Sequence, residues 1–105
     1  MIVVSSDLIP GRRIAATLGL VKGNAVRARP VFRDIMALLR GLVGGEIPEY
    51  TKMLAETREQ ALDRMIGEAR ALDADAIVAA RFITAQTMAG AAELLVYGTA
   101  VKLER

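Results

Sequence analysis

The chemistry open to this chain of 105 residues rests on carboxylates, guanidinium groups and tyrosines, because it contains neither cysteine nor histidine. The absence of cysteine excludes disulfides, iron–sulfur clusters and thiol nucleophiles. The absence of histidine removes the commonest general base and the commonest metal ligand. Neither a catalytic triad based on histidine nor an ordinary zinc site can be built from the remaining side chains.

Four charged residues are the candidates for binding a ligand, and the first two are neighbours in the chain. Arg33 and Asp34 fall in the first turn of an expected helix, where adjacent positions do not share a face. We therefore expect them to pair with other elements, inside the subunit or across an interface. The functional alternative is that they hold an anion at the positive end of that helix.

The other two candidates are Arg58 and Asp75. Arg58 lies beside the apolar stripe of a second expected helix, between Leu54 and Leu62. A charge in that position needs a carboxylate partner or a path to water. We predict an ion pair with Asp34 or Asp75, and the alternative is a role for Arg58 in a ligand pocket.

Metal binding has little support in these residue types. Soft heavy metals prefer thiolate, thioether and imidazole ligands, and of these only the thioether of methionine is present. Met36, Met53 and Met65 fit helix packing better than metal binding. A hard cation could bind Asp73 and Asp75 with backbone carbonyls, but two aspartates at a helix end are common. Metal ligands and cofactors therefore stay unassigned.

General acid–base chemistry is left to five side chains, Tyr50, Tyr97, Asp7, Asp34 and Asp75. Two carboxylates placed close together can catalyse hydrolysis, but the spacing singles out no pair. The chain has no phosphate-binding loop and no dinucleotide fingerprint. We assign no catalytic residue, and the sequence favours a binding or scaffold protein over an enzyme.

Six elements must position these residues. They are strands at 2–4 and 14–29, helices at 31–42 and 48–72, and strands at 76–87 and 93–102. Apolar residues recur with helical spacing in both helices, and the long strands are apolar on both faces. Lys22-Gly23-Asn24 indicates a bulge rather than a hairpin turn. Asp73 is expected to end the second helix in a left-handed conformation.

This order predicts a single α+β domain over residues 1–105, with a mostly antiparallel sheet and two helices on one face. The other face is also apolar, and we expect nothing in the chain to cover it. Hydrophobic residues make up 53% of the chain, and a whole sheet face left in water would forgo several kcal/mol, on the order of a domain's stability. A second copy that supplies the missing layer is the simplest solution, so we expect a homo-oligomer.

The charge distribution is consistent with self-association. Basic residues dominate positions 1–40 and acidic residues dominate positions 41–75, so the two parts could attract each other across an interface. Nucleic acid is a poorer partner, because two tyrosines and two phenylalanines offer few stacking platforms. Charges and a turn interrupt the apolar stretch 76–101, which argues against a membrane partner. The first residues lack a signal-peptide pattern, so we expect a cytoplasmic protein.

The order of several short motifs resembles the YbjQ-like family of heavy-metal-binding domain proteins. The motifs are Ile9-Pro10-Gly11, Gly19-Leu20-Val21-Lys22-Gly23, Phe32-Arg33-Asp34, Gly44-Gly45 before Tyr50, Ala69-Arg70-Ala71-Leu72 with Ala74-Asp75-Ala76, and Gly98-Thr99-Ala100-Val101. They span nearly the whole chain. Two positions depart from the family's pattern: Glu46 stands where arginine is frequent, and Asp73 where glycine is frequent.

The resemblance implies a dodecin-like subunit in a closed homo-oligomeric ring, with a pentamer as the implied assembly, and it implies no established activity. With the residues above, it predicts a non-enzymatic, ring-forming binding or scaffold protein with ligand sites at the subunit junctions. Two alternatives stay open. One is a protein that binds or sequesters a small molecule or metal ion, and the other is a small enzyme that uses arginine and aspartate at those junctions.

Overall fold

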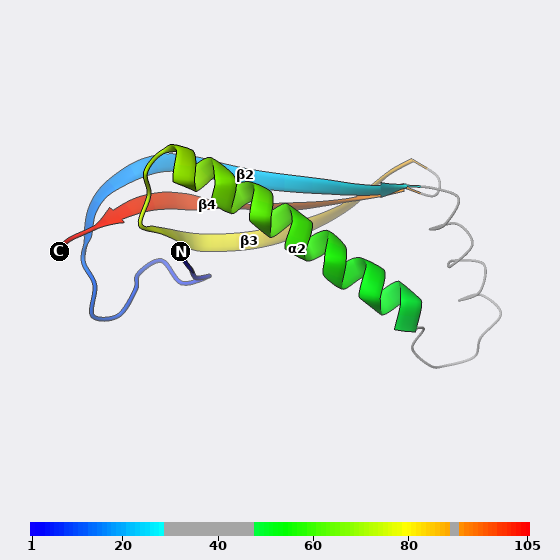
Figure 1. The fold of residues 1–105 in the computed structure, drawn as a ribbon, viewed down its shortest axis with the longest axis horizontal. Coiled ribbons are helices and arrows are strands. Elements are labelled where there is room, and N and C mark those ends of the chain that lie inside the picture. The colour runs from blue at the N-terminus through cyan, green and yellow to red at the C-terminus, as the bar shows by residue number, and fades with distance from the viewer. Residues whose placement is uncertain (29–47, 89–90) are drawn as a thin grey trace.

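The computed structural model describes residues 1–28, 48–88 and 91–105 (Figure 1). These ranges contain the elements β1 (Ile2–Val3), β2 (Ile14–Ala28), α2 (Pro48–Ala71), β3 (Ala76–Met88) and β4 (Ala91–Leu103). The expected helix at 31–42 lies outside the described residues, as do Arg33 and Asp34. Within the described ranges, no helix is long and apolar enough to cross a membrane.

The strands form one mixed sheet in the order β1-β3-β4-β2. β1 runs parallel to β3, whereas β4 is antiparallel to both β3 and β2. The ladder between β2 and β4 extends from Ile14, opposite Leu103, to Ala28, opposite Ala91. α2 lies obliquely along one side of this sheet (Figure 1) and packs mainly against β2.

The chain is therefore a small α+β fold, but the predicted arrangement of its layers is corrected in two respects. In the described residues one helix, not two, covers the sheet, and its 24 residues reach about 36 Å, which is long enough to run along the strands alone. The single chain also shows no closed ring, because its sheet is open, with β1 and β2 at the two edges.

The main core lies between α2 and the sheet. Every fourth residue of α2 from Thr57 to Ala69 is buried, so the helix presents one narrow stripe. The sheet residues in this core are Val21, Ala25, Ile77, Val96 and Ala100. Gly23 lies beneath the helix, where a Cβ atom would collide with the backbone of Ala61 and Met65. Glycine at this position therefore allows α2 to approach β2 closely.

A smaller core closes one end of the opposite sheet face. Val4 and Ile9 of the N-terminal segment, together with Ile14 at the start of β2, pack there on a second cluster. That cluster consists of Ala76, Val78, Val101 and Leu103. The expectation that nothing in the chain covers this face is thus wrong at this end, because the segment before β2 folds over it.

The rest of that face stays open within the described residues. The cross-strand register places Leu20, Val26 and Ile83 on it, and these residues are 67%, 53% and 47% exposed. The chain exposes 6867 Å² in total, whereas a compact monomer of 11.3 kDa exposes about 5,700 Å². Its radius of gyration is 16.9 Å, against about 13 Å for a compact domain of this length. The single chain is therefore extended.

Irregularities occur in the strands, but not where the sequence predicts a bulge. Residues 22–24 pair in regular register with β4. The β2 ladder shifts instead between Thr17 and Gly19, and Gly19 has a φ of +135°. The β3 ladder shifts after Val78, where Ala79 has a φ of 55°. The glycine at position 23 serves helix packing, which strand periodicity does not show.

Candidate functional site

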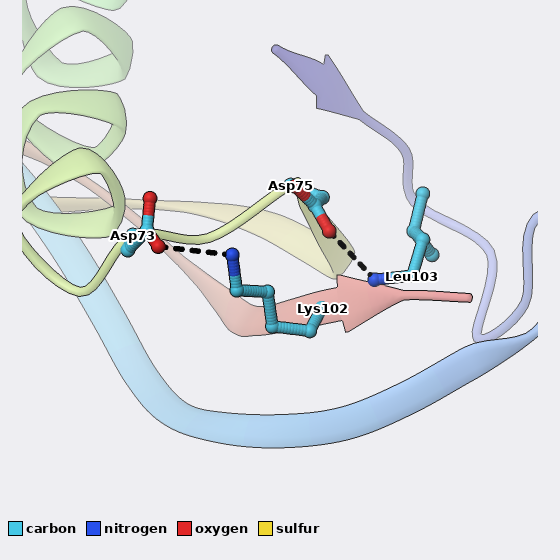
Figure 2. Close-up of polar contacts among 4 residues, drawn as sticks. All are labelled: Asp73, Asp75, Lys102 and Leu103. Carbon is cyan, nitrogen blue, oxygen red and sulfur yellow. Dashed lines mark hydrogen bonds and ion pairs between the residues drawn. The ribbon is translucent and has the colours of Figure 1, made fainter. Parts of the chain in front are cut away.

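Asp75, one of the predicted site residues, lies between α2 and β3 and holds the end of β4 (Figure 2). Its backbone N–H donates to the carbonyl of Val101 at 2.9 Å. Its carboxylate accepts a hydrogen bond from the backbone N–H of Leu103, also at 2.9 Å. Asp75 thus satisfies two backbone groups near the end of β4, and its carboxylate has a structural role.

The pKa of Asp75 is lowered below its ordinary value of 3.8. The main cause is the hydrogen bond from the Leu103 N–H, which favours the ionised carboxylate. Partial desolvation opposes this effect, while the positive charges of Lys102, Arg105 and Arg12 add to it. Asp75 is therefore ionised at neutral pH, and its pKa is far from the value that suits a general acid or base.

Asp73 ends α2 in the left-handed conformation that the sequence predicts, with a φ of 61°. Its N–H donates to the carbonyl of Arg70 at 2.9 Å, and the N–H of Ala74 donates to that of Ala69 at 3.1 Å, which is the Schellman pattern. The Asp73 carboxylate pairs with Lys102 Nζ at 3.0 Å. Because the aspartate side chain is 94% exposed, this ion pair contributes at most about 1 kcal/mol.

The two aspartates do not converge on a cation site. Figure 2 shows the carboxylate of Asp73 directed at Lys102 and that of Asp75 at Leu103. Over the described part of the chain, no group of three acidic side chains is placed to hold a metal ion. With no cysteine or histidine in the sequence, the donors present do not fit a soft heavy metal.

Arg58 lies on α2 with its side chain exposed, far from Asp75. The helix continues from Arg58 to Ala71, a distance of about 20 Å at 1.5 Å per residue. Asp75 follows that end and bonds to Leu103. The structure therefore does not bring Arg58 and Asp75 together, and the other predicted partner, Asp34, lies outside the described residues.

Two helix residues that the sequence analysis did not single out act at the outer edge of β2. Glu68 Oε1 accepts a hydrogen bond from the backbone N–H of Lys22 at 3.1 Å, and Arg64 Nη1 donates to the carbonyl of Asn24. The two side chains are four residues apart on α2, next to its buried stripe. That spacing is visible in the sequence, but helical periodicity does not show which strand edge the helix covers.

A polar row crosses the open face of the sheet. Lys22 of β2, Tyr97 of β4 and Arg81 of β3 are cross-strand neighbours. Arg81 Nη1 donates to the carbonyl of Ser5 at 2.7 Å and to that of Ala80 at 3.0 Å, so its charge is directed at the backbone. Tyr97, a candidate acid–base group, therefore has two basic residues and no carboxylate in its row.

These features define a class, a small α+β domain with an open mixed sheet and aspartates in structural roles. Residues 1–104 match the model of a family described as "Putative heavy-metal-binding", YbjQ_1, and the chain belongs to this family. The resemblance noted in the sequence is thereby confirmed. The family is described by heavy-metal binding, but this chain lacks the cysteine and histidine ligands that soft heavy metals prefer.

Similar proteins match over almost the full length. A "UPF0145 protein" of Archaeoglobus fulgidus is 57% identical, over 98% of this chain and 95% of that protein. "UPF0145 protein TTHA1944" of Thermus thermophilus is 54% identical, over 99% and 91%. A crystal structure of a DUF74 family protein of unknown function from Pediococcus pentosaceus has a TM-score of 0.67 at 14% identity, covering 99% of this chain and 98% of that one. This last likeness supports the fold alone.

Proposed function

We propose that this protein is a homo-oligomeric binding or scaffold protein without catalytic activity of its own. The observation that carries the proposal is the open sheet face, where Leu20, Val26 and Ile83 are 67%, 53% and 47% exposed. Apolar side chains gathered on one face of a soluble domain mark a surface that binds a partner. A second copy of this chain is the simplest partner, because it is present wherever the first copy is.

The total surface area supports the same proposal. The chain exposes 6867 Å², about 1,100 Å² more than a compact monomer of its mass. A standard protein interface buries about 800 Å² on each partner. The excess is therefore of the size that association with another copy would remove.

The state of the candidate residues favours binding or assembly over catalysis. The Asp75 carboxylate is bound to the Leu103 N–H, and Asp73 pairs with Lys102. Among the described residues, no group of three acidic side chains is gathered at one place. Ligands would then bind where copies meet, and the polar row that Arg81, Tyr97 and Lys22 form across the open face supplies polar groups for such a site.

Native mass spectrometry of the gently purified protein tests this proposal. A single oligomer without added mass supports a scaffold, and an oligomer with a stoichiometric organic adduct supports a binding protein and gives the ligand class. A stoichiometric metal adduct would replace the proposal with metal binding, the alternative suggested by the family's description. A monomer at micromolar concentration would overturn it. The same spectrum gives the number of subunits; an assembly of five subunits stays a prediction.

A further inference from the structure

The outer edge of β3 changes character partway along the strand. Up to Ala80 this edge is occupied, because β1 pairs with the first residues of β3 and the N–H of Ala80 donates to the carbonyl of Val4 at 3.0 Å. β3 has only β1 and β4 as neighbours in the sheet. From Arg81 to Met88, therefore, no described strand lies on the outer side of β3.

After Arg81, this open stretch has few of the features that usually protect an edge strand; one register shift against β4 lies between Ala85 and Met88. Proteins prevent unwanted pairing at edges with charged residues, prolines, bulges or covering elements. After Arg81, the sequence Phe82-Ile83-Thr84-Ala85-Gln86-Thr87-Met88 has no charge, no proline and no glycine. Such a strand is suited to pair with another strand.

The outer edge of β2 differs in this respect. There the N–H of Lys22 and the carbonyl of Asn24 are bonded to side chains of α2, Glu68 and Arg64. A strand that approached β2 at these residues would have to displace both hydrogen bonds. At Lys22 and Asn24 the edge of β2 is thus occupied by the chain's own helix, whereas no described element occupies the edge of β3 after Arg81.

We propose that a strand of a second copy of this chain pairs with β3 along Arg81–Met88. This inference rests on the proposed homo-oligomer and states which edge forms its interface. Phe82 and Ile83 lie on opposite faces of β3 and are 49% and 47% exposed. An added strand would extend the sheet and cover both side chains. The excess area of about 1,100 Å² exceeds the 800 Å² or so per partner of a standard interface, so one added copy accounts for most of it.

A matched pair of lysine variants of the full chain tests the proposal. Ile83→Lys places a charge at the proposed interface, whereas Leu72→Lys places one just after α2, off the open sheet face and at similar exposure. We expect Ile83→Lys to raise the concentration at which the oligomer dissociates by at least about tenfold, because a charge would be buried without a partner. Leu72→Lys should leave that concentration unchanged. Far-ultraviolet circular dichroism checks that both variants fold.

Amide hydrogen exchange provides a second measurement that does not depend on a variant. In the wild-type oligomer, about every second amide of Arg81–Met88 points outward and should be protected from exchange. In dissociated Ile83→Lys these amides should exchange quickly, while the amide of Lys22 stays protected by Glu68.

The outcomes separate this proposal from the broader one. A monomeric wild type would overturn both. An oligomeric wild type with fast exchange along Arg81–Met88 would overturn the edge pairing while leaving the oligomer in place. If Ile83→Lys dissociated no more readily than Leu72→Lys, the edge pairing would also be overturned, because a charge on β3 would then not weaken the interface.

Discussion

β2 and β3 lie on opposite sides of β4, and each has backbone donors and acceptors on its outer side. On β2, side chains of α2 bond to the N–H of Lys22 and to the carbonyl of Asn24. On β3, the N-terminal segment bonds to the edge as far as Ala80, and the described residues beyond it have no partner on that side. The two edges therefore differ in whether the chain itself satisfies them.

The two edges show how the packing of one helix can influence where a sheet associates. α2 approaches β2 closely because Gly23 has no side chain, and at that distance the side chains of Glu68 and Arg64 reach the strand edge. Protection of β2 thus depends on helix packing. β3 lies farther from α2, so its tip is left available to another chain.

Gly23→Val should have the largest effect, because it removes the close approach on which the protected edge depends. The new side chain would overlap the backbone of Ala61 and Met65. We expect a loss of about 3 kcal/mol in the free energy of unfolding, measured by urea denaturation at fixed protein concentration. Gly67→Ala is the control: Gly67 lies on α2, the helix that packs over Gly23, with no atom near its Cβ position, and the change should stabilise the protein by about 0.5–1 kcal/mol. Equal stability of Gly23→Val and wild type would show that α2 does not pack this closely.

Glu68→Ala should remove the protection of the β2 edge at Lys22, and it should destabilise the protein less than Gly23→Val does. The lost hydrogen bond to the Lys22 N–H is exposed, so we expect a destabilisation of about 0.5–1 kcal/mol and faster amide exchange at Lys22. Glu59→Ala, an exposed glutamate of the same helix, serves as the control and should leave that amide unchanged. Unchanged exchange in Glu68→Ala would mean that the β2 edge is open like the tip of β3.

The backbone conformation of Asp73 determines how α2 ends before β3 begins. Its left-handed conformation is unfavourable for alanine and free of strain for glycine. Asp73→Ala should lower the free energy of unfolding by about 1 kcal/mol, while Asp73→Gly should match or exceed the wild type. Lys102→Ala isolates the exposed ion pair and should cost less than about 1 kcal/mol. Equal losses in the alanine and glycine variants would assign the effect to the carboxylate instead of the backbone.

The smallest expected effect is a dependence of stability on pH that arises at Asp75, where β3 begins. Because the folded protein lowers the pKa of Asp75 below 3.8, the folded state binds its proton less readily than the unfolded state does. The resulting stabilisation is present above pH 3.8 and is lost as the pH falls through the lowered pKa. In urea titrations from neutral pH downward, Asp75→Asn should show a weaker acid dependence than the wild type. An identical acid dependence would exclude Asp75 as its source.

Much of the fold could be predicted from local patterns in the sequence. The strands and the long helix follow from runs and spacings of apolar residues, and α2, expected at 48–72, is observed at Pro48–Ala71. The left-handed end at Asp73 follows from residue chemistry and position. The family also follows from the order of its motifs. Two predictions were wrong for the described residues: that two helices cover the sheet, and that the fold closes into a ring. Local periodicity predicts elements but does not reveal how they are arranged in space.

The candidate site was harder to predict for the same reason. The sequence indicates that Arg58 and Asp75 carry charges in unusual places, but only the structure shows that about 20 Å of helix lies between Arg58 and the turn that leads to Asp75. It also shows that Asp75 bonds to Leu103 rather than to an arginine. Hydrogen bonds between residues distant in sequence depend on the packing angle of α2, which no local spacing encodes.

The residue types alone limit the chemistry open to this protein, because the absence of cysteine and histidine removes the corresponding ligands and nucleophiles whatever the fold. The sequence also determined the elements, since helices and strands follow from local apolar periodicity. The tertiary structure was needed to show that α2 protects β2 at Lys22 and Asn24 and that no described strand pairs with β3 beyond Ala80. That distinction arises where Gly23 meets Ala61 and Met65, at contacts between segments about forty residues apart whose distance depends on packing across the whole sheet.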